Sequence, residues 1–82
     1  MKAVRLLGPN DFTVENIPVP EISEDEILLR MKTTAICGTD MRILTGKKTR
    51  GVRYPSTIGH EICGVIEKVG AHVEGFAPGQ KV

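Results

Sequence analysis

Glycine and proline interrupt this chain so often that no long regular element fits between them. Nine glycines and five prolines are spread over 82 residues, with turn-forming clusters at residues 8–11, 18–20, 55–59 and 75–79. Clusters of this kind end helices and central strands. A chain divided in this way favours short strands joined by tight turns. The first expectation is therefore a small domain made mainly of β-strands.

Apolar runs of strand length, two of them alternating with polar residues, show where the strands should lie. Residues 2–7, 12–17, 27–36 and 61–69 are the candidate strands, and residues 81–82 begin another. In the third, Ile27, Leu29 and Met31 share one face, which predicts a half-buried strand. Residues 39–45 predict a short helix with Thr39 as its N-cap and Gly46 at its end. Residues 55–59 predict a turn. Together these elements indicate a mainly β barrel or sandwich with one short helix.

Composition excludes several classes of partner. Eleven basic and ten acidic residues give a net charge of +1, so neither nucleic acid nor an anionic membrane is expected to bind. Aromatic residues make up 4%, too few for a base-stacking platform. The chain has no signal-like leader and no apolar run near the length of a membrane span, which indicates a soluble, cytoplasmic protein. A domain of this size also needs a metal, a disulfide, a partner or more chain to support its small core.

Cys37 and His60 are the candidate metal ligands. Each stands beside a glycine next to a predicted strand, and each has a carboxylate nearby, Asp40 for the first and Glu61 for the second. The two residues are too far apart in sequence for a local metal knuckle, so only tertiary structure can bring them together. A structural role for either residue stays open, since a lone cysteine often packs as a small apolar side chain. Neighbouring strand residues point to opposite faces, so His60 and Glu61 should not both face one metal.

Four sequence elements resemble those of one enzyme family. Residues 59–64 read G-H-E-I-C-G, followed by Gly70 and Val73, and this segment resembles the signature of zinc-type alcohol dehydrogenases. Residues 37–40, C-G-T-D, resemble an element of the polyol and threonine dehydrogenases in that medium-chain family. Residues 1–4 and 78–82 are similar to the family's first strand and to a later turn. The resemblance covers the whole chain in the right order.

The resemblance implies a fold and an activity. The fold is mainly β, a GroES-like, partly open β-barrel with one short helix, incomplete at its C-terminus. Residues 1–82 would be the N-terminal portion of the catalytic domain, with no Rossmann domain present. The complete enzyme would oxidise an alcohol or polyol to a carbonyl compound by hydride transfer to NAD or NADP, bound by a domain absent from this chain. The third zinc ligand would also lie later in the enzyme, and the 82-residue piece alone would be inactive.

The same resemblance implies a role for each matching residue. Cys37 and His60 would be ligands of the catalytic zinc. Asp40 would orient the histidine imidazole, although it also suits the start of a helix, where backbone N–H groups are free. Glu61 would lie behind the metal as an alternate ligand. Thr39 would accept a hydrogen bond from the zinc-bound alcohol and begin a proton relay.

One departure concerns Arg42, which stands where many relatives have a histidine that serves the proton relay. An arginine cannot shuttle protons near neutral pH. Two interpretations stay open for Arg42 and the basic loop that follows it: recognition of an anionic, for example phosphorylated, substrate, or a merely solvated surface. The loop contains no acid and four basic residues, which are Lys47, Lys48, Arg50 and Arg53.

The remaining cysteine and histidine predict no function. Cys63 lies within a predicted strand and is expected in the core. A Cys37–Cys63 disulfide is not expected in a reducing compartment. His72 lies in a turn and is expected to be exposed.

Other classes of function remain as alternatives. A GroES-like barrel could act alone as a binding or assembly module without catalysis. A zinc-free, quinone-oxidoreductase-like relative is a third possibility, against which the presence of both Cys37 and His60 argues. Strand edges left unpaired favour self-association, so a homo-oligomer is expected.

Overall fold

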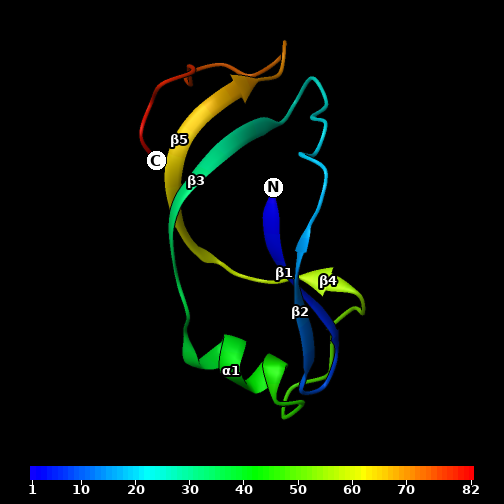
Figure 1. The fold of residues 1–82 in the computed structure, drawn as a ribbon. Coiled ribbons are helices and arrows are strands. Elements are labelled where there is room, and N and C mark those ends of the chain that lie inside the picture. Colours follow the sequence, from blue (N-terminus) through cyan, green and yellow to red (C-terminus); the bar gives the residue numbers. More distant parts are fainter. The chain divides into compact units, whose positions relative to one another are not determined.

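The computed structural model describes residues 1–82 and divides into two compact units (Figure 1). The first contains residues 1–18 and 35–61, and the second contains residues 19–34 and 62–82. The elements in chain order are β1 (Lys2–Gly8), β2 (Asp11–Asn16), β3 (Ile27–Ala35), α1 (Gly38–Leu44), β4 (Ser56–Thr57) and β5 (Glu61–Val69). The expectation of a mainly β chain with one short helix is confirmed.

The first unit is built on a three-stranded antiparallel sheet in the order β2-β1-β4. β1 and β2 form a hairpin in which Lys2 lies opposite Asn16. The turn between them contains Asn10 with a φ of 56°, a left-handed conformation that asparagine tolerates better than most residues. Leu6 is fully buried and Ala3 nearly so, and these two side chains of β1 form the core of the unit.

The expected turn at residues 55–59 is wrong in part, because Ser56 and Thr57 form β4. Thr57 pairs with Arg5 of β1 and Ser56 pairs with Leu6. The Arg5 guanidinium Nη1 also donates a hydrogen bond to the Thr57 hydroxyl at 3.4 Å. A two-residue strand has no alternation pattern of its own. It forms because β1 offers backbone groups on the edge that β2 leaves free.

Helix α1 agrees with the sequence prediction to within one residue, but its N-cap does not. Cys37, not Thr39, is the N-cap, because the Asp40 carboxylate accepts the backbone N–H of Cys37 at 3.0 Å and thereby fixes the start of the helix at Gly38. Gly46 follows the C-cap residue Thr45 with a φ of 80°, as predicted for the helix end. The helix is neither long nor apolar enough to cross a membrane.

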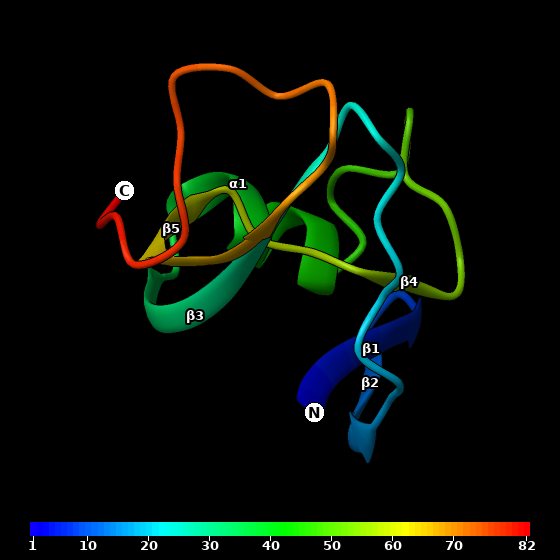
Figure 2. The ribbon, with the colours of Figure 1, turned by 90° about the horizontal axis from the view of Figure 1, so that it is seen from above.

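The second unit pairs β3 with β5, and its C-terminal residues run back along β5 (Figure 2). The Gly64 N–H donates to the Val82 carbonyl at 2.9 Å, and the Val82 N–H donates to the Gly64 carbonyl at 3.0 Å. These bonds confirm that residues 81–82 begin a strand pairing. Ile66 is almost fully buried and forms the core. An ion pair between Arg30 and Glu67 joins β3 to β5.

Two predictions of burial in this unit are wrong. β3 is half-buried only over residues 27–29 and exposed from residue 30 onward. Cys63 is exposed rather than in the core. Gly64 and Ile66 face inward, and the twofold alternation of a strand therefore turns Cys63 outward. Both cysteines are free, and His72 is exposed, as expected.

Candidate metal centre

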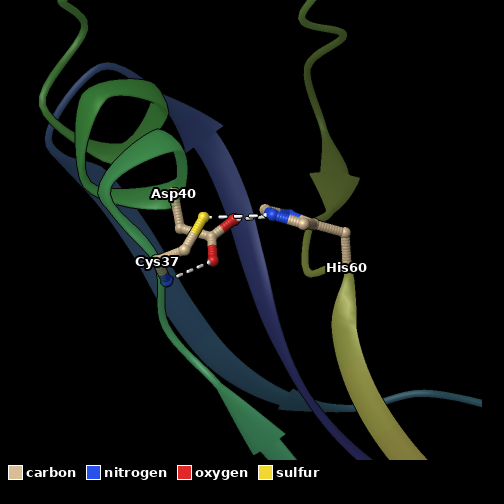
Figure 3. A group of neighbouring side chains, drawn as sticks. All are labelled: Cys37, Asp40 and His60. Carbon is tan, nitrogen blue, oxygen red and sulfur yellow. Dashed lines mark hydrogen bonds and ion pairs between the residues drawn. The ribbon is translucent and has the colours of Figure 1, made fainter.

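Cys37 stands between β3 and α1, and its position follows from the start of the helix. The residue has an extended backbone, with φ −106° and ψ 173°, while the next residue is already helical. Its side chain is half-buried. The sulfur lies 3.0 Å from Nε2 of His60, which is 23 residues further along the chain (Figure 3). The long sequence separation is thus closed by tertiary structure, as the metal hypothesis requires.

His60 lies between β4 and β5, directly after a glycine with an unusual backbone. Gly59 has a φ of 138°, a conformation that residues with a side chain rarely adopt. The imidazole of His60 has a different neighbour at each nitrogen. Nε2 faces the sulfur of Cys37, and Nδ1 lies 3.5 Å from Oδ1 of Asp40 (Figure 3). The His60 side chain is 54% exposed, so it is accessible to a ligand from outside.

Asp40 is the one charged residue that is buried, with a side chain only 7% exposed. Its Oδ2 accepts the Cys37 N–H at 3.0 Å, whereas its Oδ1 has no hydrogen-bond partner. A buried carboxylate oxygen without a partner is unfavourable. The nearest group that can relieve it is the Nδ1 edge of His60. An N–H at Nδ1 would leave Nε2 free as a lone-pair donor toward Cys37.

These three side chains fit zinc by the chemistry of their donor atoms. One donor atom from each residue can be chosen so that all three lie within 4.8 Å of one another. Thiolate and imidazole are the donors that zinc prefers, and a zinc-bound histidine commonly donates its other N–H to a carboxylate. Ligand atoms of one tetrahedral zinc lie about 3.5 Å apart, given bond lengths of about 2.3 Å to sulfur and 2.0–2.1 Å to nitrogen. The observed sulfur–nitrogen distance of 3.0 Å would therefore have to open by about half an ångström.

The other predicted residues are arranged less closely. Thr39 is half-buried in the first turn of α1, beside Asp40. Glu61 is the exposed first residue of β5 and does not join the cluster of possible donors. Arg42 is exposed and follows Asp40 by two helical positions, so its side chain leaves the helix about 200° away from that of Asp40. The loop that carries Lys47, Lys48, Arg50 and Arg53 is exposed.

One residue of the β1–β2 turn was missed by the sequence analysis. Asn10 donates its backbone N–H to the carbonyl of Leu44, the last residue of α1. The Gly8–Asp11 segment was recognised only as a turn, because a sequence pattern cannot show what a turn contacts. The cluster and the turn are both parts of the first unit.

Comparison with known proteins places the chain in a family. Residues 23–82 match the model of the alcohol dehydrogenase GroES-like domain. The chain belongs to this family. Its membership confirms the resemblance seen in the sequence, and the GroES-like fold class with it.

Three curated relatives show the range of the family. An alcohol dehydrogenase from Cupriavidus necator is 42% identical over 82 residues, which is all of this chain and 22% of that protein. Human sorbitol dehydrogenase is 40% identical over 77 residues, covering 92% of this chain and 22% of the enzyme. An acryloyl-coenzyme A reductase from Sulfurisphaera tokodaii is 39% identical over 83 residues, covering 100% of this chain and 25% of that protein. The chain thus spans about a quarter or less of the length of these relatives.

Solved structures are similar over nearly the whole chain. A protein from Sinorhizobium meliloti 1021, assigned as a zinc-binding dehydrogenase and bound to NADP, has a TM-score of 0.89 and 38% identity, covering 98% of this chain and 23% of its own. Galactitol-1-phosphate dehydrogenase from Escherichia coli has a TM-score of 0.89 and 30% identity, covering 99% of this chain and 23% of its own. The names of the relatives span more than one reaction, so the choice of reaction depends on the site residues of this chain.

Proposed function

We propose that this chain is the N-terminal part of the catalytic domain of a zinc-dependent, NAD(P)-dependent dehydrogenase that acts on an alcohol or polyol. The observation that carries the proposal is the approach of Cys37 and His60 beside the buried Asp40. Catalytic zinc sites use three protein ligands and leave one position open. Cys37 and His60 would supply two of those ligands. The third ligand and the nicotinamide site would come from outside residues 1–82.

Each residue of the site would have a separate task. Bound zinc would act as a Lewis acid that favours loss of the proton from the substrate hydroxyl. Asp40 would hold the proton at Nδ1 of His60, which keeps Nε2 unprotonated and aimed at the metal. Thr39 would accept a hydrogen bond from the substrate hydroxyl at its Oγ1 and begin the path by which the proton leaves. Glu61 would serve as the alternate ligand behind the metal.

Charge distribution supports a more specific substrate class. The first unit contains seven basic and four acidic residues, giving +3, whereas the second contains four basic and six acidic residues, giving −2. Five of the basic side chains, all between residues 42 and 53, form no ion pair. Unpaired cations next to the helix that carries Asp40 favour a polyol that bears a phosphate. Replacing Lys48 and Arg50 together by Gln should then lower kcat/KM for a polyol phosphate more than for the free polyol, whereas Lys32→Gln should affect both equally.

Two cysteines and two histidines allow a matched test of the zinc site. In the full-length protein, Cys37→Ala and His60→Ala should each reduce bound zinc, measured by elemental analysis, and abolish alcohol oxidation. Cys63→Ala and His72→Ala remove the same side-chain types away from the cluster and should retain both properties. If Cys37→Ala and His60→Ala kept full zinc content and activity, the proposal would be wrong. If the folded wild-type protein also bound no zinc, the result would favour a binding or assembly module without catalysis.

A further inference from the structure

Helix α1 carries Cys37 at its N-cap and Asp40 in its first turn, yet the helix has little to hold it in place. It is seven residues long, which is too short to be stable in water by itself. Asp40 is its only buried residue, and its apolar residues Ile43 and Leu44 are only half-buried, so its apolar anchoring is partial. Hydrogen bonds at its two ends therefore contribute to fixing its position.

The C-terminal end of a helix leaves several backbone carbonyls without partners inside the helix. Most of those in α1 are satisfied by the residues that follow. The Met41 carbonyl accepts the backbone N–H of Thr45 at 3.0 Å and its hydroxyl at 2.8 Å. The Arg42 carbonyl accepts the Lys48 N–H at 3.0 Å, and that of Ile43 accepts the Gly46 N–H at 3.2 Å.

The last two carbonyls are satisfied from another part of the chain. Asn10, in the turn between β1 and β2, donates its backbone N–H to the Leu44 carbonyl at 2.7 Å. Its side-chain Nδ2 donates to the Thr45 carbonyl at 3.3 Å. One residue of the hairpin therefore caps the end of α1 with two hydrogen bonds, and its left-handed backbone directs both donors to the same place.

Gly46 allows the hairpin turn to approach this closely. A Cβ atom at residue 46 would lie 2.6 Å from Cβ and 3.2 Å from Cγ of Pro9, distances that are too short for carbon atoms. The proline ring is rigid and cannot move aside. Any larger residue at position 46 would thus push the turn away from the end of α1.

We propose that Asn10 is a positioning residue for the metal site, acting with Pro9 and Gly46 as a clasp on the far end of α1. This inference rests on the proposed zinc site. The clasp fixes the direction of the helix, and so fixes where Cys37 and Asp40 present the sulfur and the carboxylate to His60. If this contact is weakened, Cys37, Asp40 and His60 are all still present but are less ordered before the metal binds. Ordering them on binding then costs free energy, which weakens metal binding.

The decisive experiment uses the full-length protein loaded with Co²⁺ in place of zinc. Absorption by Co²⁺ reports the cobalt–sulfur bond and the coordination geometry, and zinc affinity is measured separately by competition with a chelator. Asn10→Gly keeps the left-handed backbone and the N–H to Leu44 but removes the side-chain donor. Zinc affinity should fall by up to about fivefold, the limit reached if the whole hydrogen bond of about 1 kcal/mol serves to order the ligands for the metal, and the cobalt spectrum should shift.

Two matched controls separate positioning from general stability. Asn16→Gly introduces the same change in β2, where glycine also destabilises a strand, and should leave the cobalt spectrum and zinc affinity unchanged. Gly46→Ala should weaken zinc binding, whereas Gly51→Ala should not. Gly51 has a φ of 77°, nearly that of Gly46, but nothing lies within 4 Å of its Cβ position. Both alanines therefore meet the same backbone strain, and only that at residue 46 meets Pro9.

The outcomes are distinct. Zinc affinity and cobalt spectra of Asn10→Gly and Gly46→Ala that match the wild type, even with lowered thermal stability, would overturn the positioning role alone. Equal changes in Asn16→Gly or Gly51→Ala would overturn it as well, since they would show a general effect of destabilisation. A wild-type protein that takes up neither zinc nor Co²⁺ would overturn the proposed zinc site and this inference together.

Discussion

Replacing Gly64 by alanine tests whether the last glycine of the G-H-E-I-C-G segment is required for packing. Gly64 is buried in β5, and a Cβ atom there would overlap the Arg30 carbonyl oxygen of β3. It would also lie 3.1 Å from the Arg30 carbonyl carbon and 3.4 Å from the Met31 Cα. All three neighbours are backbone atoms, so no side-chain rotation can make room.

The size of the effect follows from these distances. Non-bonded carbon atoms rest about 3.5–4.0 Å apart, so β3 would have to retreat by roughly half an ångström at Arg30. On its other side β5 is bonded to Val82 in both directions, at 2.9 and 3.0 Å, which prevents a simple shift. Overpacking typically destabilises by about 1–3 kcal/mol, while restricting the unfolded chain offsets about 0.4–1 kcal/mol. A net loss of about 1.3 kcal/mol is expected.

Amide hydrogen exchange in β3 and β5 measures this loss locally, whatever the size of the protein that contains them. A loss of about 1.3 kcal/mol corresponds to exchange about ninefold faster in these strands. Gly8→Ala is the control. Gly8 is also a strand residue, the last of β1, but it has nothing within 4 Å of its Cβ position. If Gly64→Ala exchanged no faster than Gly8→Ala, the close approach of β3 would not be the reason for glycine at this position.

Three further predictions concern single residues. Asp40→Asn should lower zinc affinity by about 10–100-fold while Cys37 and His60 still bind the metal, as expected for a group that orients a ligand; complete loss of binding would instead indicate direct ligation. The backbone N–H of Ser23 donates a hydrogen bond to the Glu26 carboxylate at 2.9 Å and lowers the pKa of Glu26. This bond therefore stabilises the folded turn at pH values above the ordinary pKa of glutamate. The stabilisation is lost as the pH falls through the lowered pKa. Carboxyl-carbon NMR should show the low pKa, and Glu26→Gln should remove that pH dependence. Gly70→Ala should speed exchange as Gly64→Ala does, because a Cβ there would overlap backbone atoms of Ser23 and Glu24; an unchanged rate would contradict this.

Local patterns predicted most of the elements, because they depend on neighbours in the sequence. Strand-length apolar runs bounded by turn residues located β1, β2 and β5 to within a residue, and Gly46 marked the end of α1. The motifs also identify Cys37 and His60 as a pair from the sequence alone. This pairing is predictable because several family-like elements occur in the expected order and spacing. Neither residue alone would indicate it.

Other features depend on contacts between distant residues. β4 exists only because β1 has a free edge, and Cys37 is the N-cap only because Asp40 folds back to its N–H. The exposure of Cys63 reflects its place on the face of β5 opposite to that of the buried Gly64 and Ile66. The local sequence does not predict any of these features, because each depends on residues in other parts of the chain.

Residue types and their order are enough to establish the family, the mainly β character and the identity of the candidate ligands. How the ligands are oriented toward one another depends on the folded chain. It turned Nε2 of His60 to the sulfur of Cys37 and Nδ1 to the buried Asp40, and it set the turn at Asn10 against the end of α1. Orientation and distance arise from segments that meet only after folding, and a site that binds a metal depends on both.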